Sequence, residues 1–139
     1  MNHFKIYRYP LCIKEYHLDT FGHVNNAKYL ELFEEARWEF LNEEGITLES
    51  IQKKQIGPVV LEFTIQFLKE LTLRQKITIE SQLINYDNKI GAMSQCILNE
   101  QNEFCCKAKM TFGIFNMATR KLIPPPDEWL KAVGHNLRK

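Results

Sequence analysis

The 139-residue chain contains no long uninterrupted run of apolar residues, although 45% of its residues are hydrophobic. A membrane-spanning helix needs about 20 consecutive apolar residues, so the sequence predicts none. The amino terminus, MNHFKIYRYP, lacks the basic start and apolar stretch of a secretory signal, and we therefore expect a cytoplasmic protein. The net charge is only +1, which argues against binding to nucleic acid or to a membrane surface through bulk charge.

The cysteines show no metal-binding spacing. No C-x-x-C pair occurs among the four cysteines, which are Cys12, Cys96, Cys105 and Cys106. The adjacent residues Cys105 and Cys106 would point to opposite faces of a strand. Since we expect a cytoplasmic protein, the sequence predicts free thiols rather than disulfides, and no metal site.

The two parts of the chain differ in charge. Residues 1–50 carry five Lys/Arg and nine Asp/Glu, whereas residues 51–139 carry thirteen and eight. One explanation is a solvated acidic helix in the first part. The other is that basic side chains of the second part bind an anionic ligand, with Lys69, Arg74 and Lys76 as candidates for phosphate contacts.

Helical periodicity follows Asn25–Asn26. Apolar residues recur at intervals of three and four, at Tyr29, Leu30, Phe33, Ala36, Phe40 and Leu41. Asn25 or Asn26 is a suitable N-cap and Gly45 a suitable terminator, which predicts a helix roughly 26 Å long. Glu34 and Glu35 belong to its solvated face, although either one could approach a site as a second carboxylate.

The remaining segments alternate with the period of strands. This pattern predicts strands over residues 61–67, 76–84, 91–98 and 106–114, preceded by a first strand over residues 4–13 in which Pro10 marks an edge or bend. Short polar turns between the four later strands predict an antiparallel meander. A short helix is expected over residues 127–136. One domain over residues 1–139 follows, of class α+β, with a single helix covering one face of the sheet.

Polar and small residues gather between the first strand and the helix, in the segment H-L-D-T-F-G-H-V-N-N-A-K-Y over residues 17–29. A helix N-terminus offers free N–H groups and a partial positive charge, which favour an anion or a polarised carbonyl oxygen. Asp19 lies six or seven residues ahead of it, and Gly22 lets the loop turn back. A carboxylate beside such donors suits acyl-group hydrolysis. Alternatively, Asp19 caps a turn, and Asn25 and Asn26 cap the helix.

The segment from Asp19 to Arg37 resembles a family signature. Its pattern, D-x-x-G-H-V-N-N-x-x-Y-L-E-x-x-E-E-A-R, is similar to that of hotdog-fold thioesterases of the 4-hydroxybenzoyl-CoA thioesterase-like and acyl-ACP thioesterase-like subgroup. In that fold one long helix is wrapped by a five-stranded antiparallel sheet. The resemblance implies hydrolysis of an acyl-CoA or acyl-carrier-protein thioester to a free acid and a thiol, without a metal or organic cofactor, in a homodimer or homotetramer.

The resemblance also implies roles for individual residues. Asp19 matches the catalytic carboxylate, which acts as a nucleophile or as a general base, and the backbone N–H near Asn26 matches the group that polarises the thioester carbonyl. His23 and Asn25 would position the carboxylate and water. Tyr29, within the same signature, joins the three basic candidates as a substrate contact. Two other functions stay open: a non-catalytic hotdog module that binds an acyl or CoA group, and a hotdog dehydratase. Phe33 and Met93 are residues that could limit pocket depth.

The segment 61–67 predicts how copies of the chain associate. It contains no lysine or proline, so as an edge strand it would lack the usual protection against pairing. Two copies would then continue the sheet about a two-fold axis, with the active site at the subunit boundary. The alternative is that this strand is interior and that Pro10 or Lys5 protects the edge.

Overall fold

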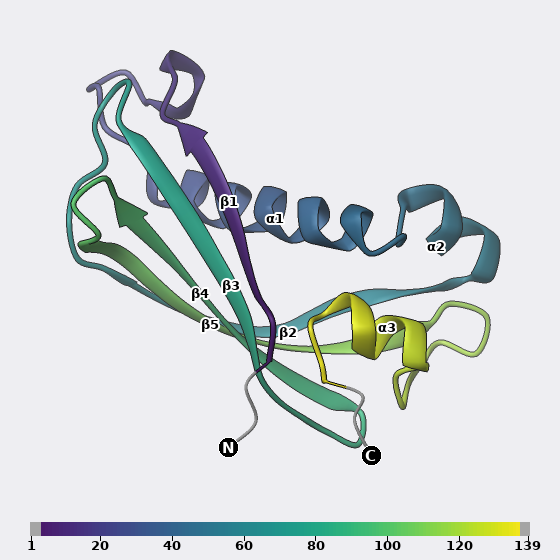
Figure 1. Ribbon diagram of the computed structural model, residues 1–139. Helices are drawn as coiled ribbons and strands as arrows, with labels where there is room; N and C mark the ends of the chain where they lie inside the picture. The colour runs from purple at the N-terminus through teal and green to yellow at the C-terminus, as the bar shows by residue number, and fades with distance from the viewer. Residues whose placement is uncertain (1–3, 137–139) are drawn as a thin grey trace.

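A curled antiparallel sheet wraps around one long helix, α1, in the computed structural model, which describes residues 4–136 (Figure 1). The elements in chain order are β1 (Ile6–Cys12), the short 3-10 helix η1 (Glu15–His17), α1 (Asn26–Glu43), α2 (Leu48–Lys54), β2 (Ile56–Phe67), β3 (Lys76–Asp87), β4 (Ile90–Asn99), β5 (Phe104–Asn116), β6 (Lys121–Ile123) and α3 (Asp127–Ala132). The predicted α+β hotdog architecture is confirmed. A short sixth strand, β6, and the helix α2 were not predicted.

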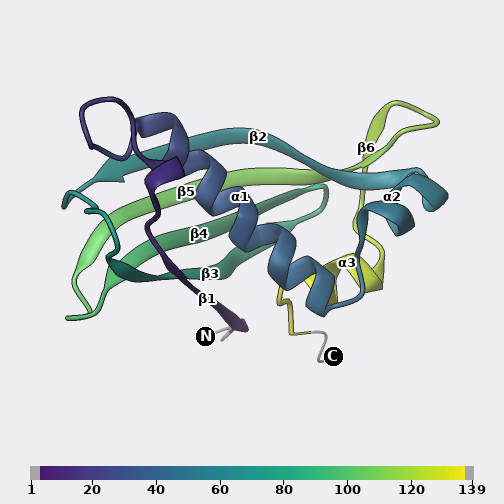
Figure 2. The ribbon, with the colours of Figure 1, turned by 90° about the horizontal axis from the view of Figure 1, so that it is seen from above.

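The strand order departs from the predicted meander. The sheet runs β1-β3-β4-β5-β2, and β6 pairs with β5. Only β3, β4 and β5 form a meander, so the prediction that the strand over 61–67 pairs with the next one was wrong. Figure 2 shows β2 beside β5, at the opposite edge from β1. Residues 68–75 make this possible because they form a long connection anchored by buried Leu71 rather than a tight turn.

Helix α1 forms for the predicted reasons. Asn25 is the N-cap, and its side chain accepts a hydrogen bond from the Ala27 N–H at 2.9 Å. Gly45 follows the helix with φ +90°, a left-handed conformation that costs glycine little. The residues of α1 that face the sheet and are buried are Tyr29, Leu32, Phe33, Ala36, Phe40 and Leu41. Leu30, although part of the apolar pattern, is exposed.

Most strands extend beyond the alternating patterns that predicted them. β3 continues to Asp87, past an irregularity between Leu83 and Asn85, because backbone pairing with β4 persists where the alternation ends. β2 begins at Ile56 and contains a β-bulge between Val60 and Glu62. The bulge breaks the alternation, so Leu61 is exposed whereas the side chains at positions 63 and 65 are half-buried. Two segments are shorter than predicted: α3 ends at Ala132, and β1 covers only part of 4–13.

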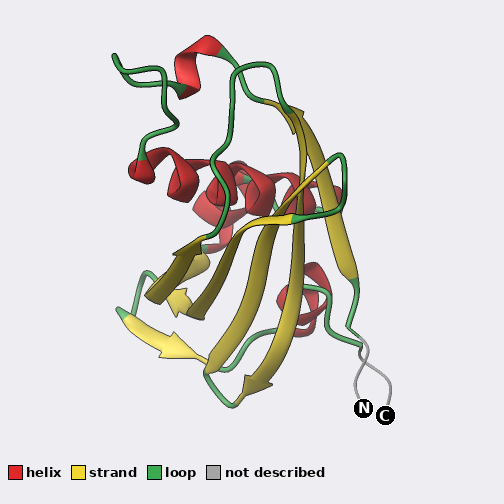
Figure 3. Ribbon diagram, turned by 90° about the vertical axis from the view of Figure 1, so that its left-hand side faces the viewer, coloured by secondary structure: helices red, strands yellow, loops and turns green. Residues whose placement is uncertain are grey.

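The core consists of two apolar clusters along α1. One lies near the start of the helix and includes Phe33, Ile79 and Ile97, whereas the other lies near its end and includes Phe40 and Trp129. Figure 3 shows the sheet curling around the helix, and both clusters lie between them. The four cysteines are free thiols, as predicted, and both members of the adjacent pair are buried. No helix within residues 4–136 has both the length and the apolarity needed to cross a membrane.

Candidate active site

Backbone and side-chain hydrogen bonds fix Asp19 in a tight loop ahead of α1. The Asp19 N–H donates to the His23 carbonyl at 2.8 Å. Oδ1 of Asp19 accepts from the N–H groups of Phe21 at 2.9 Å and His23 at 3.1 Å. Gly22, at φ +79°, lets the chain reverse within this loop. Both side-chain bonds use Oδ1, so the second carboxylate oxygen takes no part in holding the loop.

The start of α1 adjoins this loop, because His23 lies two residues before the N-cap Asn25. The Ala27 N–H donates to the Asn25 side chain, and the Lys28 N–H donates to the Asn25 backbone carbonyl at 2.9 Å. Asn26 is the first residue of the helix and is exposed, and helical geometry gives its N–H no partner within the helix. The site therefore combines a fixed carboxylate with a helix-terminal donor and the partial positive charge of the helix end.

His23 and Tyr29 occupy different environments beside this centre. The His23 Nε2 lies 3.3 Å from Oε1 of Glu70, and both side chains are exposed. Glu70 belongs to the connection between β2 and β3, so this pair joins the connection to the Asp19 loop. Tyr29 is buried beneath the helix start, where its ring packs edge-on against Phe67 with centroids 4.9 Å apart. Burial raises the pKa of the Tyr29 hydroxyl above its ordinary value.

The predicted basic residues are spread over the surface near this end of the molecule. Lys69 Nζ lies 2.6 Å from a Glu103 oxygen, and Arg74 Nη2 lies 2.7 Å from a Glu15 oxygen. Lys76 is exposed at the start of β3. The structure thus bonds Asp19 to His23 in the loop that leads directly to Asn25 and Asn26 at the helix start. The basic residues are separate, and two of them are held by carboxylates.

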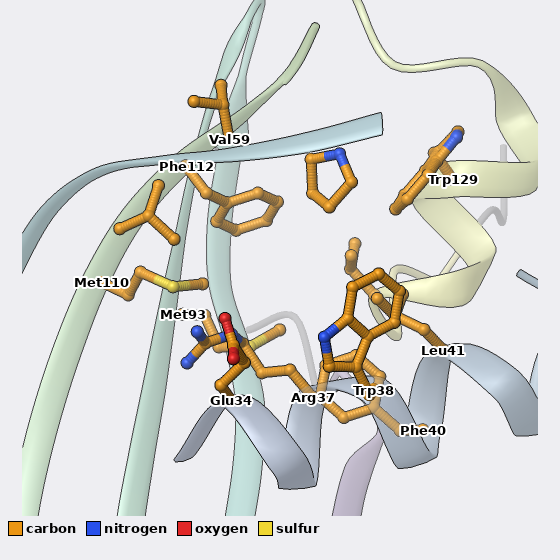
Figure 4. Close-up of a pocket in the computed structure, with 13 residues that line it drawn as sticks. Glu34, Arg37, Trp38, Phe40, Leu41, Val59, Met93, Met110, Phe112 and Trp129 are labelled. Atoms are coloured by element: carbon orange, nitrogen blue, oxygen red, sulfur yellow. The ribbon is translucent and has the colours of Figure 1, made fainter. Parts of the chain in front are cut away.

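A cavity of about 150 Å³ lies farther along α1 (Figure 4). Its wall is mostly apolar and comes from α1, β2, β4, β5 and α3, with residues on α3 and its C-terminal flank contributing Trp129 and Val133. Met93, which the sequence suggested as a limit on pocket depth, lines it, but buried Phe33 does not. The contribution of α3 carried no recognisable signal in the sequence.

Comparison with known proteins places this geometry in a family. The model of the thioesterase-like superfamily matches residues 14–133, which include the Asp19 loop, all of α1 and every strand from β2 to β6. The chain belongs to the thioesterase-like superfamily. The predicted resemblance to hotdog thioesterases and the predicted enzyme class, a thioesterase, are both confirmed by this match and by the relatives below.

Several thioesterases are similar to the chain. The long-chain acyl-CoA thioesterase FadM of Escherichia coli K12 is 36% identical over 112 residues, which cover 80% of this chain and 84% of FadM. The chloroplastic acyl-acyl carrier protein thioesterase ATL3 of Arabidopsis thaliana is 32% identical over 73 residues, covering 52% of this chain and 38% of ATL3.

Among solved structures, the probable thioesterase YbaW of Escherichia coli superposes with a TM-score of 0.78 at 32% identity, covering 95% of this chain and 97% of YbaW. The Staphylococcus aureus protein SAV2348, whose structure was solved in complex with CoA, has a TM-score of 0.86 at 16% identity, covering 98% and 89% of the two chains. At that identity the likeness shows the shared fold alone.

A buried polar network crosses the core of this thioesterase and was not predicted. The Gln95 amide nitrogen donates to the Phe33 carbonyl at 3.1 Å and to the Ser81 hydroxyl at 2.9 Å. The Gln95 oxygen accepts from Arg37 Nη1 at 2.8 Å. Burial lowers the pKa of the Arg37 guanidinium. One sequence signal could have revealed the network: Gln95 is a polar residue between Met93 and Ile97 on the inward face of a strand.

Replacement of Gln95 should strongly destabilise the enzyme. Gln95→Met keeps the size of the side chain but leaves the Ser81 hydroxyl, the Phe33 carbonyl and the Arg37 guanidinium without their shared partner. We expect a loss of about 2–4 kcal/mol in the free energy of unfolding. Leaving a buried polar group without a hydrogen-bond partner costs more free energy than one hydrogen bond contributes to stability. Urea denaturation measures the loss. The exposed Gln52→Met variant in α2 is the control, and equal stabilities for the two variants would contradict the prediction.

His17, the last residue of η1, is buried, and its side chain is neutral. Its Nδ1 accepts a hydrogen bond from the Lys14 N–H at 2.9 Å, and burial lowers its pKa. An imidazole nitrogen that accepts this bond carries no proton. Within residues 4–136, moreover, no group of three or more His, Cys, Asp or Glu side chains is placed to hold a metal ion. The structure therefore gives His17 a structural role in the turn after β1.

Stability should consequently depend on pH through His17. Its pKa is lower in the folded than in the unfolded state, so the unfolded state takes up the proton first as the pH falls. The stabilisation is complete above about pH 6.5, the ordinary histidine value, and is lost at lower pH. His17→Asn, whose side-chain oxygen can accept the same bond, should lose less stability between pH 7.5 and 5.5 than the parent in urea denaturation. The same loss in both proteins would assign the effect to other groups.

Proposed function

We propose that the protein is an acyl-CoA thioesterase that hydrolyses a fatty acyl-CoA to the free acid and CoA, with Asp19 as its catalytic carboxylate. The observation that carries the proposal is the loop that holds Asp19 beside the N-terminus of α1. The identity to FadM, which is named a long-chain acyl-CoA thioesterase, supports the substrate class.

The proposed reaction uses the two sides of this centre together. The substrate's thioester carbonyl oxygen accepts a hydrogen bond from the Asn26 N–H, where the helix end stabilises the developing negative charge. The Asp19 carboxylate takes a proton from water as the water oxygen attacks the carbonyl carbon. The carbon–sulfur bond then breaks, and the leaving thiolate takes up the proton that Asp19 received, which restores the carboxylate. Direct attack by the carboxylate, giving an anhydride that water hydrolyses, is the other form of this step.

The surrounding residues have supporting roles in this proposal. His23 and Asn25 fix the position of the loop relative to the helix start. The His23 backbone N–H donates a hydrogen bond to Asp19, and the Asn25 side chain caps α1. Lys69, Arg74 and Lys76 would contact the phosphates of CoA, which requires Lys69 and Arg74 to exchange their glutamate partners for phosphate. Tyr29 supports the site from below through its contact with Phe67.

The test is hydrolysis of a substrate panel, measured as release of free thiol. It contains acyl-CoAs with saturated chains from 6 to 18 carbons, benzoyl-CoA and hexadecanoyl-ACP. Turnover of saturated acyl-CoAs is expected. Preference for the carrier-protein substrate would favour the acyl-ACP activity suggested by the match to ATL3. Absence of turnover on every substrate would favour a non-catalytic acyl-binding module and refute the proposal.

Asn26 allows a control on the oxyanion assignment. Since the proposed contact comes from the backbone N–H, Asn26→Ala should reduce kcat far less than a change of Asp19. A loss of kcat in Asn26→Ala as large as that in Asp19→Asn would instead assign the contact to the side chain.

A further inference from the structure

One face of α1 runs from the proposed oxyanion site to the cavity. Asn26, Leu30, Glu34, Arg37 and Leu41 follow one another at intervals of four, four, three and four residues, so they lie along one side of the helix. Asn26 is at the N-terminus of α1, and the last three of these residues line the cavity. The helix axis rises roughly 12 Å from Asn26 to Glu34 and roughly 22 Å from Asn26 to Leu41.

A groove between α1 and β2 begins beside Leu30, one helical turn beyond Asn26, and adjoins the cavity. It is lined by Leu30, Glu31, Glu34, Arg37, Val60 and Phe63. Three of these residues, Glu34, Arg37 and Val60, also line the cavity, so the groove opens into it. The Arg37 guanidinium lies 5.8 Å from the Phe63 ring centre and is held by Gln95. Arg37, which lines the groove, is thus held in place by a hydrogen bond to the buried Gln95 of β4.

Trp129 forms the wall of the cavity at the end away from the groove. Trp129 lies across the cavity from Glu34 and Arg37 in Figure 4. Its side chain is buried, and Val133, which also lines the cavity, lies one helical turn farther along the chain. An unfilled apolar cavity lowers the stability of a protein, so a cavity that opens to a groove is better explained by an apolar ligand than by packing.

We infer that the acyl chain of the substrate lies along this groove and ends in the cavity, and that Trp129 sets the longest chain the enzyme accepts. The inference rests on the proposed function, since it starts from a thioester carbonyl at the N-terminus of α1. An extended chain built from carbon–carbon bonds of about 1.5 Å advances roughly 1.3 Å per carbon, so about nine carbons reach Glu34. Apolar cavities of this volume bind benzene, so this one would hold roughly six further carbons. The preferred substrate is therefore a saturated acyl group of about 14 to 16 carbons.

The experiment compares chain-length profiles of kcat/KM on saturated acyl-CoAs in three variants and the parent. Val59→Phe fills the cavity from β2, Trp129→Leu enlarges it at the end away from the groove, and Leu130→Ala alters the neighbouring residue of α3, which does not line it. Burial of each methylene changes kcat/KM by roughly fourfold. We expect Val59→Phe to lower the ratio of hexadecanoyl to hexanoyl hydrolysis at least tenfold. Trp129→Leu should move the optimum about two carbons longer, and Leu130→Ala should keep the parent profile.

The outcomes separate this inference from the proposed function. Turnover of acyl-CoAs with a parent-like profile in both Val59→Phe and Trp129→Leu would overturn the inference and leave the proposed function standing. A parent optimum at six carbons or fewer would overturn it as well. No turnover by the parent on any acyl-CoA would instead refute the proposed function. Inhibition by free hexadecanoate measures binding of the acyl chain separately from hydrolysis. The inhibition constant should rise at least tenfold in Val59→Phe relative to Leu130→Ala. Equal inhibition constants in the two variants would contradict an acyl chain that ends in the cavity.

Discussion

Asp19→Asn should lower kcat on acyl-CoA at least ~100-fold, which is the lower range of what general-base catalysis contributes. The amide has the shape of the carboxylate but can neither take a proton from water nor attack the carbonyl carbon. Its oxygen can still accept the hydrogen bonds that Oδ1 receives from the N–H groups of Phe21 and His23, so the loop should keep its form. The measurement is steady-state thiol release together with thermal unfolding of both proteins.

The matched control for this change is Asp127→Asn, which removes a carboxylate of the same type from the first turn of α3, far along the chain from the Asp19 loop. Its kcat should stay close to that of the parent. A well-folded Asp19→Asn protein with nearly full activity would remove Asp19 from the mechanism. Loss of activity accompanied by a large drop in Tm would show a structural role for the carboxylate instead.

The second large effect concerns assembly. We expect a homodimer of twice 16.4 kDa in sedimentation equilibrium at micromolar concentration, with the active site at the subunit boundary. β2 is an edge strand of the sheet. Along it or just beyond it, about half of the surface of each of four apolar residues is exposed: Val60, Leu61, Phe67 and Leu68. Pro58 and the bulge after Val60 protect the first part of the strand, so pairing should use its second part, from Glu62 to Phe67.

Thr64→Asp tests this interface. Because Thr64 lies near the middle of the unprotected part of β2, a two-fold axis there would bring two such carboxylates close together, and like charges facing each other disfavour pairing. We expect a shift to monomer and a loss of activity. Thr119→Asp, in the exposed turn between β5 and β6, should remain dimeric. A parent protein that is monomeric and active would contradict both the dimer and the shared site. Tetramer formation would mean that two such dimers associate through a further surface.

Local chemistry in the sequence accounts for the parts of the structure that were predicted correctly. The helix α1 has its cap and terminator within its own segment, Asn25 and Gly45, so its ends follow from backbone hydrogen bonding. The Asp19 loop is similar: its hydrogen bonds join residues no more than four positions apart. The strands β3, β4 and β5 follow one another with tight turns, and alternation was enough to find them, although pairing extended them beyond it.

The remaining features depend on residues far apart in the chain. The sequence of β2 does not say which strand it pairs with, because the edge it joins is settled by the path of residues 68–75 and by the burial of Leu71. Ion pairing is equally non-local: Lys69 and Arg74 looked like free phosphate ligands until the fold placed Glu103 and Glu15 beside them.

The long helix, its caps and the carboxylate loop ahead of it follow from local sequence, since each is stabilised by contacts within a few residues. The order of the strands, the network around Gln95 and the cavity lined by Trp129 depend instead on packing between distant parts of the chain. Gln95 joins residues of α1 and β3, and Trp129 meets residues of α1 that precede it by about ninety positions. Such contacts form when the sheet curls around the helix, and no local pattern specifies which side chains then meet.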